Sequence, residues 1–282
     1  MGVDRAWHVR FLTFTFFFLL NSLSSTSLAD PRPQNTSRQT LPQTLTIAVA
    51  NSFKPVAEQI AAEYSSETGV AIRIASASSG VLANQLLHGA PFDLFLSADS
   101  ERPKLLVERG IGLADSRLTY AYGRLVFWWP PGGAHQGGLP DLDKLNQVSR
   151  LAIANPRTAP YGEAAQQVLE SLGLWQKMQS QLVRGAGASQ AYQFVAGGNI
   201  AAGLLPLSLL IQGGIETDYL ELPSYLYQRM AHQAVVISRG NQALAWAFLR
   251  YLMGPGQQAV KALGFEAASV EPSVIESVGG QS

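Results

Sequence analysis

The 282-residue sequence contains no cysteine, which excludes disulfides, zinc–thiolate centres and thiol catalysis. Charged residues are scarce, at 14%, and the two signs balance to a formal net charge of zero. A neutral chain without a polybasic tract does not fit nucleic-acid binding or an electrostatic membrane anchor. The sequence also has no Walker loop, dinucleotide-binding glycine fingerprint, GxSxG elbow or HExxH metal motif.

Apolar residues, in contrast, make up 47% of the chain. With so few charges, this composition is typical of a globular protein with a substantial core and not of a disordered one. The length allows one large domain or two modest lobes.

The N-terminus has the pattern of an export signal. Arg5 and Arg10 precede the apolar run "FLTFTFFFLL", and small residues ending at Ala29 follow it. We therefore predict a signal peptide over residues 1–29, cleaved after Ala29, and a periplasmic protein. The run is short for a membrane span, so a retained anchor is the less favoured alternative, and the absence of cysteine excludes a lipoprotein.

Two further segments are predicted to carry no regular structure. Residues 30–43 are rich in proline, serine, threonine and glutamine and are typical of a flexible linker. Residues 269–282 resemble a loose tail, and the glycine-rich stretch around His135 resembles an exposed loop.

From residue 44 the chain alternates between short apolar runs and helical patterns. This alternation predicts an α/β fold with mixed, mostly parallel sheets. Strands are expected over 45–50, 70–76, 93–98, 124–129, 150–155, 200–206 and 231–238. Helices are expected over 54–69, 81–89, 102–110, 161–173 and 189–198, with two more within 241–265. Ligands in such folds bind beyond the carboxyl ends of the strands.

Four strand-to-helix junctions combine small or hydroxyl residues with the start of a helix. They are Asn51-Ser52, "SASSG" at 76–80, "NPRTAPYG" at 155–162 and "GAGAS" at 185–189. A helix start offers unpaired N–H groups and a positive dipole end. Several such starts converging on one cleft would make a neutral cage of donors for an anion.

Each junction also has an ordinary structural interpretation. Ser52 and Ser79 could act only as helix N-caps, worth about 1 kcal/mol each. Tyr161 could be a packed aromatic residue. Lys54 and Arg157 could steer anions, although solvated surface charge is the more common role for such residues.

Enzymatic chemistry has little support in the sequence. The histidines are His8, His88, His135 and His232, and their spacing does not form a metal motif. Asp93 and Asp99 flank one predicted strand, where a structural role is favoured over an acid/base pair. A hydrolase using these two carboxylates is the enzyme alternative, and a binding protein is preferred.

The junction motifs together resemble a known family. "AVANSF", "ASSGVLANQLLHGAPFDLFLSAD", "RLAIANPRTAPYG" and "GASQAYQFVAGGNIAAG" follow in the order and spacing of the periplasmic molybdate-binding proteins of ABC importers. These belong to the type II periplasmic binding protein superfamily, and the resemblance covers about residues 45–266. It implies two α/β lobes joined by a hinge, with lobe one formed by 44–122 and 232–268 and lobe two by 123–231.

The resemblance also implies the ligand-binding positions. Ser52 and Ser79 match the family's two serines, and Asn51 lies where some members use an amide. Tyr161 and Ala188 lie where the family presents backbone N–H groups. Pro206 occupies the position of a tyrosine that contacts the anion in some members, and Tyr161 is the residue that could compensate.

The resemblance implies capture of molybdate, and of tungstate, for delivery to an ABC permease in the membrane. The chain is expected to be a monomer with no resident cofactor and no metal other than molybdenum within the anion. Because of Pro206, another oxyanion such as sulfate remains the alternative ligand.

Overall fold

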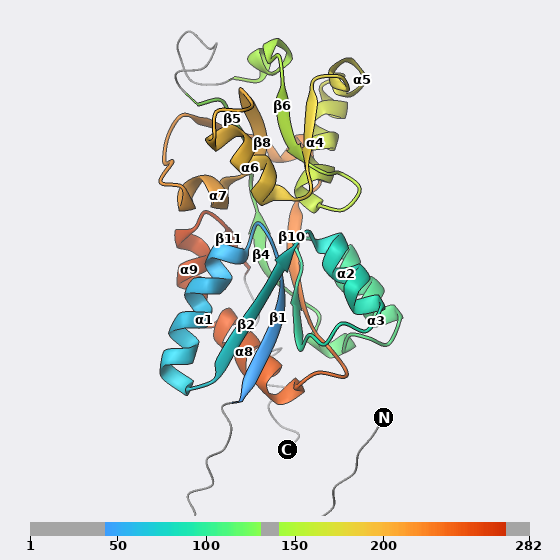
Figure 1. The fold of residues 1–282 in the computed structure, drawn as a ribbon, viewed down its shortest axis with the longest axis vertical. Helices are drawn as coiled ribbons and strands as arrows, with labels where there is room; N and C mark the ends of the chain where they lie inside the picture. The colour runs from blue at the N-terminus through green and yellow to red at the C-terminus, as the bar shows by residue number, and fades with distance from the viewer. Residues whose placement is uncertain (1–42, 131–140, 269–282) are drawn as a thin grey trace, which may run out of the picture. The chain divides into compact units, whose positions relative to one another are not determined.

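The computed structural model describes residues 43–130 and 141–268, which form two β-sheets with helices on both faces (Figure 1). The predicted signal peptide, residues 30–42 of the predicted linker, the loop around His135 and the predicted tail lie outside the described residues. In the part of the chain that the structure describes, none of the helices is both long and apolar enough to cross a membrane.

The first sheet has the strand order β11-β4-β10-β3-β1-β2. Its strands are β1 (Thr44–Ala50), β2 (Ala71–Ala77), β3 (Leu94–Leu96), β4 (Leu118–Gly123), β10 (Met230–Val236) and β11 (Glu266–Ala267). Its helices are α1 (Lys54–Thr68), α2 (Ser79–Leu87), α3 (Glu101–Glu108), α8 (Gln242–Met253) and α9 (Gln257–Ala262), and η1 (Ala114–Ser116) is a short 3₁₀ turn. We call this sheet and its helices the first lobe.

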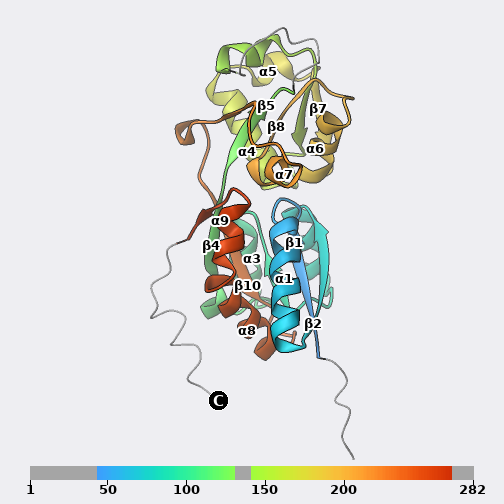
Figure 2. The same cartoon turned by 90° about the vertical axis from the view of Figure 1, so that its left-hand side faces the viewer.

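Apolar periodicity decides which face of the first sheet each helix covers. Val56, Ile60 and Tyr64 of α1 recur at helical spacing and pack with α8 and α9 in one core cluster. Figure 2 shows α1 and α9 side by side over this face. The opposite face is covered by α2 and α3 through a separate cluster that includes Leu82 and Leu106.

The second sheet has the order β7-β6-β8-β5-β9. Its strands are β5 (Leu125–Trp128), β6 (Leu151–Ala154), β7 (Leu182–Gly185), β8 (Ala202–Pro206) and β9 (Tyr219–Glu221). The helices are α4 (Pro160–Ser171), α5 (Trp175–Met178), α6 (Ala188–Ala196) and α7 (Leu207–Gln212), with 3₁₀ turns η2 (Leu142–Gln147) and η3 (Ser224–Leu226). In this second lobe α4 covers one face, and α6 and α7 cover the other.

The chain crosses between the lobes twice. Strand β4 ends at Gly123 in the first sheet, and β5 begins at Leu125 in the second. The return lies between β9 and β10, whose first residue, Met230, pairs with Gly123. Two neighbouring segments therefore join the lobes.

The two sheets are mixed, as predicted, but parallel pairing does not predominate. Among the described strands, four pairs are parallel and five are antiparallel. Each antiparallel pair includes β4, β5 or β10, the strands that flank the two crossings. The parallel pairs join β1 with β2 and β3, and β6 with β7 and β8. Of these strands, β1, β2, β6 and β7 lead into the four predicted junctions.

Candidate functional site

The four predicted junctions meet at one small cavity between the lobes. Asn51, Ser52, Ser79, Tyr161 and Ala188, the five predicted site residues, all line it. Two come from the β1–α1 junction and one each from β2–α2, β6–α4 and β7–α6. Among the described residues, none of those lining the cavity is charged.

At the first junction, Ser52 does not cap α1. The residue at the N-cap is Phe53, and the helix start has no side-chain cap bond. The Ser52 hydroxyl is instead buried, with the residue 2% exposed, and has no hydrogen-bond partner. A buried hydroxyl without a partner is costly, and this one can donate to an acceptor placed in the cavity.

Asn51 is held in place from its own lobe. Its backbone N–H donates to the Ala77 carbonyl at 3.0 Å, and its Oδ1 accepts from the Ser76 hydroxyl at 2.9 Å. These bonds leave the Nδ2 amide group as the remaining donor. That nitrogen faces Gly187 of the second lobe, where an added Cβ would lie 2.3 Å from it.

At the second junction, Ser79 is the first residue of α2, and its Oγ accepts from the Ala98 N–H at 3.0 Å. Because this bond uses an oxygen lone pair, the Ser79 proton is available for donation. The N-cap is Ser78, whose buried hydroxyl has no partner and also lines the cavity. Ser78 was not among the predicted site residues, although the run of serines in "SASSG" was a signal for it.

At the third junction, α4 begins with Pro160 and Tyr161 directly against the end of β6. A Cβ on Gly162 would lie 2.5 Å from the Ala154 carbonyl oxygen, so glycine permits this close approach. The N–H of Tyr161 lies in the first turn of α4, where backbone N–H groups have no acceptor within the helix.

The Tyr161 side chain is also buried, and its hydroxyl makes no hydrogen bond of normal geometry. Burial raises its pKa, and the repulsion of Tyr227 adds to the rise, whereas the polar groups of Ser52 and the Arg124 backbone lie near enough to lower it although neither meets the geometry of a hydrogen bond. The hydroxyl is therefore neutral and retains a proton to donate. It lies against Gly123, where a Cβ would come within 2.3 Å of it.

At the fourth junction, Gly187 is the N-cap of α6 and Ala188 is its first residue. The first hydrogen bond of the helix is donated by Ala191 to the Gly187 carbonyl. The N–H groups of residues 188–190 therefore have no acceptor within the helix. With no capping side chain, they are free to meet an acceptor in the cavity.

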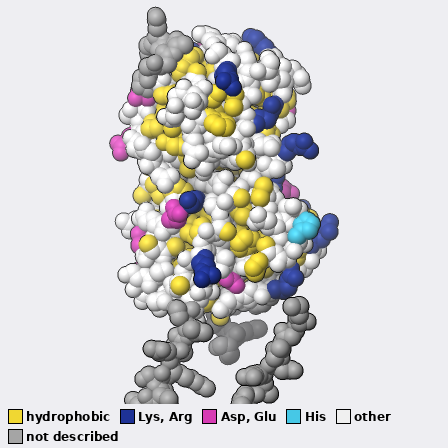
Figure 3. Space-filling view, in the orientation of Figure 1, with side chains coloured by type: hydrophobic (Ala, Val, Ile, Leu, Met, Phe, Trp, Pro, Cys, Tyr) yellow, Lys and Arg dark blue, Asp and Glu magenta, His cyan; other side chains and the backbone are white. Residues whose placement is uncertain are grey.

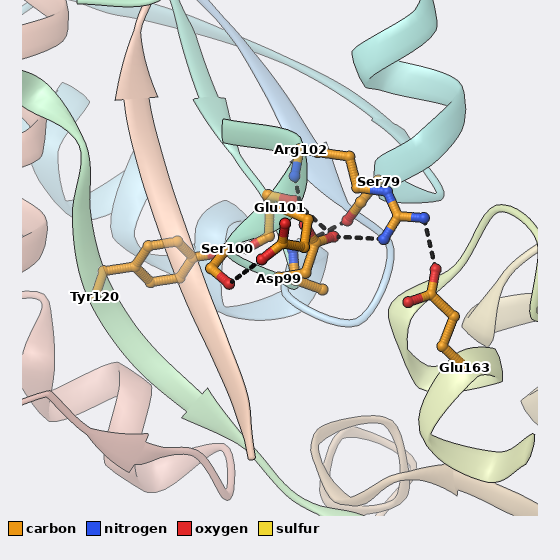
Figure 4. Close-up of polar contacts among 9 residues, drawn as sticks. Ser79, Asp99, Ser100, Glu101, Arg102, Tyr120 and Glu163 are labelled. Carbon is orange, nitrogen blue, oxygen red and sulfur yellow. Dashed lines mark hydrogen bonds and ion pairs between the residues drawn. The ribbon is translucent and has the colours of Figure 1, made fainter. Parts of the chain in front are cut away.

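A charged network lies beside the cavity and joins the lobes (Figure 4). Arg102 of α3 contacts Asp99 at 3.1 Å and Glu163 of α4 at 2.6 Å. Burial raises the pKa of the Asp99 carboxyl, and the attraction of Arg102 opposes part of that rise. Asp99 also accepts from the Ser97 hydroxyl at 3.2 Å, so its carboxylate is already engaged by Arg102 and Ser97.

Two further bonds cross between the lobes. The Gly80 N–H of α2 donates to the Thr158 carbonyl at 2.9 Å. The Ser208 hydroxyl of α7 donates to the Ser52 carbonyl at 2.8 Å. The structure thus has the two lobes in direct contact around the cavity.

The two carboxylates of the enzyme alternative do not form a pair. Asp93 accepts from the Thr46 and Asn241 N–H groups, both at 2.7 Å, and so ties β1 to the start of α8 at the other end of β3. Asp99 is engaged by Arg102. In the described ranges, no group of three histidine, aspartate or glutamate side chains could hold a metal ion.

The remaining residues named from the sequence lie outside the cavity lining. Lys54 is exposed and forms an ion pair with Glu58 at 3.4 Å, and Arg157 is exposed. On the face shown in Figure 3, lysine and arginine side chains of the described residues are scattered among other types. Pro206 ends β8 and is buried.

Comparisons with known proteins agree with this arrangement. A family model described as bacterial extracellular solute-binding protein matches residues 45–266. The molybdate-binding protein ModA of Azotobacter vinelandii is 39% identical over 78% of this chain and 88% of its own length. ModA of Rhodobacter capsulatus is 38% identical over 74% of this chain and 82% of its own. The structure of the Azotobacter vinelandii periplasmic molybdate-binding protein superposes with a TM-score of 0.74 and 32% identity, covering 80% of this chain and 100% of that one.

Proposed function

This chain belongs to the bacterial extracellular solute-binding protein family, and we propose that it captures molybdate in the cavity between its lobes. The observation that carries the proposal is the set of buried hydroxyls without partners on Ser52, Ser78 and Tyr161. They line the same cavity as the free helix starts of α4 and α6. The two relatives that are 38–39% identical are molybdate-binding proteins.

The donor chemistry suits a fully deprotonated tetrahedral anion. Such an anion offers only acceptors, and the cavity offers hydroxyl, amide and backbone N–H donors. Each hydrogen bond to a charged group contributes about 1.5–3 kcal/mol, so five to seven donors support tight binding. The helix dipoles supply a favourable potential without a full countercharge.

The same donors explain which anions are rejected. Hydrogen phosphate carries a hydroxyl that needs an acceptor, and the nearby carboxylate of Asp99 is already engaged by Arg102. Tungstate has the same charge and nearly the same size as molybdate, and we propose that it binds as well. Sulfate is smaller and fully deprotonated, so only cavity size discriminates against it.

Export and delivery complete the proposal. Membership in an extracellular solute-binding family fits the predicted signal peptide and a periplasmic location, where a monomer would present the anion to an ABC permease. Closure of the lobes would bury the anion, and opening would release it, because no covalent bond or fixed countercharge holds it.

Calorimetric titration with molybdate, tungstate, sulfate and phosphate tests the ligand. We expect saturable heats with molybdate and tungstate and none with phosphate. Binding of sulfate without any heat or thermal shift from molybdate would overturn the molybdate assignment and favour the sulfate alternative.

The Ser79→Ala variant tests the site. Loss of one hydrogen bond to a charged ligand is expected to weaken molybdate binding about 10- to 100-fold. The matched control is Ser116→Ala, because Ser116 is also buried, accepts from the Val236 N–H at 2.8 Å and donates to the Leu113 carbonyl at 2.6 Å, away from the cavity. The control should lose stability and keep its affinity; unchanged affinity in Ser79→Ala would remove Ser79 from the site.

A further inference from the structure

Ser208 contacts the site from the opposite lobe without lining the cavity. Its hydroxyl donates to the backbone carbonyl of Ser52 at 2.8 Å, across 156 positions of sequence. Both residues are 2% exposed, so water does not compete for this bond in the closed arrangement. The bond therefore forms part of the closed state at the point where the first junction enters the cavity.

The Ser52 carbonyl needs a partner from outside its own helix. The turn before α1 is fixed by the Asn51 N–H on Ala77 and by the Phe53 N–H on Ala50. The first bond of the α1 ladder is donated by Ala57 to Phe53, one residue beyond Ser52. The carbonyl of Ser52 thus lies just outside the ladder, and Ser208 satisfies it.

The second lobe holds Ser208 at a defined place. Helix α7 begins directly after Pro206, which pairs with Leu125 beside the crossing between the lobes. The Leu207 N–H donates to the Arg124 carbonyl at 3.0 Å, which ties the start of α7 to the crossing itself. A rotation of the second lobe about this crossing would change the position of Ser208 relative to Ser52.

We infer that Ser208 is a positioning residue for anion binding, an inference that rests on the proposed function. On closure its hydroxyl fixes the Ser52 peptide, so that the unpartnered Ser52 side chain faces the anion. In an open state water would hydrate both the Ser208 hydroxyl and the Ser52 carbonyl. The bond consequently adds to ligand retention and not to the stability of the unliganded protein.

This assignment also gives a role to the segment that departs from the family pattern. Pro206 offers no hydroxyl to the anion, and the chain has Ser208 two residues later. Its contribution is indirect, since it orders a donor of the first lobe and does not contact the anion itself.

The test compares Ser208→Ala with wild type by calorimetry and by stopped-flow tryptophan fluorescence, with molybdate as the probe. We expect affinity to fall about threefold to tenfold, mainly through faster dissociation, with an unchanged melting temperature of the unliganded protein. The control is Ser171→Ala, which removes a hydroxyl bond of 3.0 Å to the Leu226 carbonyl within the second lobe. The control should alter stability and leave dissociation unchanged.

A double-mutant cycle with Ser52→Ala separates positioning from simple closure. If Ser208 acts through the Ser52 hydroxyl, Ser208→Ala should have less than about a twofold effect in the Ser52→Ala background. Additive effects, or an unchanged dissociation rate in the single variant, would overturn the inference. A wild-type chain that binds sulfate and not molybdate would overturn the proposed ligand instead, and the same variants would then be compared with sulfate.

Discussion

The Gly80→Leu variant is expected to bind molybdate at least about 100-fold more weakly than wild type, while the unliganded protein keeps its stability. Gly80 lies in the first turn of α2 and faces the second lobe. A Cβ at this position would lie 2.8 Å from the Thr158 carbonyl oxygen and 3.2 Å from its Cα. Its three nearest neighbours all belong to Thr158, so the second lobe is the first obstacle that a side chain would meet.

The obstacle is backbone and cannot move aside as a flexible side chain would. A leucine at position 80 would therefore hold the lobes apart and break the Gly80 N–H bond to Thr158. When the lobes are apart, the first lobe should tolerate leucine at position 80, because glycine inside a helix is less favourable than other residues by about 1 kcal/mol. The apparent affinity for molybdate falls in proportion to the fraction of molecules that can still close.

Calorimetry and small-angle scattering measure the two expected effects together. Wild type should become more compact on saturation with molybdate, and Gly80→Leu should not. Val81→Leu is the matched control, since Val81 is the next residue of α2 and is 39% exposed. Wild-type affinity in Gly80→Leu would show that binding does not require the contact between α2 and Thr158.

Local patterns in the sequence were sufficient to predict which junctions lie together in the fold. Hydroxyl and small residues at strand-to-helix junctions mark the carboxyl ends of parallel strands, and those ends meet in space. Ser52, Ser79, Tyr161 and Ala188 accordingly line one cavity although they are far apart in the chain. Helix α1 was equally predictable, since its apolar spacing and the left-handed Gly69 mark its face and its end.

Local patterns could not reveal features that depend on distant contacts. Strand β7 has only four residues with an exposed Arg184, and β4 lies at the crossing, so the prediction contained neither. Adjacent serines in "SASSG" do not show which one is the N-cap, and the structure assigns that position to Ser78. The bond between Ser208 and Ser52 depends on how two lobes meet, which no periodicity within either lobe encodes.

Acid is expected to destabilise the protein through His232, a second large effect. His232 of β10 is fully buried beside the crossing, and burial lowers its pKa to about 3. Its Nδ1 lies 3.4 Å from the Tyr120 hydroxyl, and its Nε2 has no hydrogen-bond partner. Tyr120 and Tyr161 are the titratable groups packed against the ring, and both remain neutral because burial raises their pKa.

The sign follows from proton binding in the two states. An unfolded histidine takes up a proton near its ordinary pKa of about 6.5, whereas the folded one resists protonation until the pH approaches 3. Between these values the unfolded state binds more protons, so stability is lost as the pH falls. The slope approaches about 1.4 kcal/mol per pH unit, and the loss between pH about 6.5 and about 4.5 is on the order of 2–3 kcal/mol.

Urea unfolding of wild type and His232→Gln at pH about 7 and about 4.5 isolates this contribution. Carboxylates titrate in both chains, so the difference between their pH dependences reports His232 alone. The exposed His88, whose Nδ1 lies 2.7 Å from the Asn84 carbonyl, supplies the control variant His88→Gln, which should retain the wild-type dependence. Equal acid sensitivity in wild type and His232→Gln would mean that the ring accepts a proton in the folded state. A weaker acid sensitivity in His232→Gln would mean that the folded protein requires a neutral imidazole at this position. The ring packs against Tyr161 beside the crossing, so acid would then weaken the same contacts that shape the cavity.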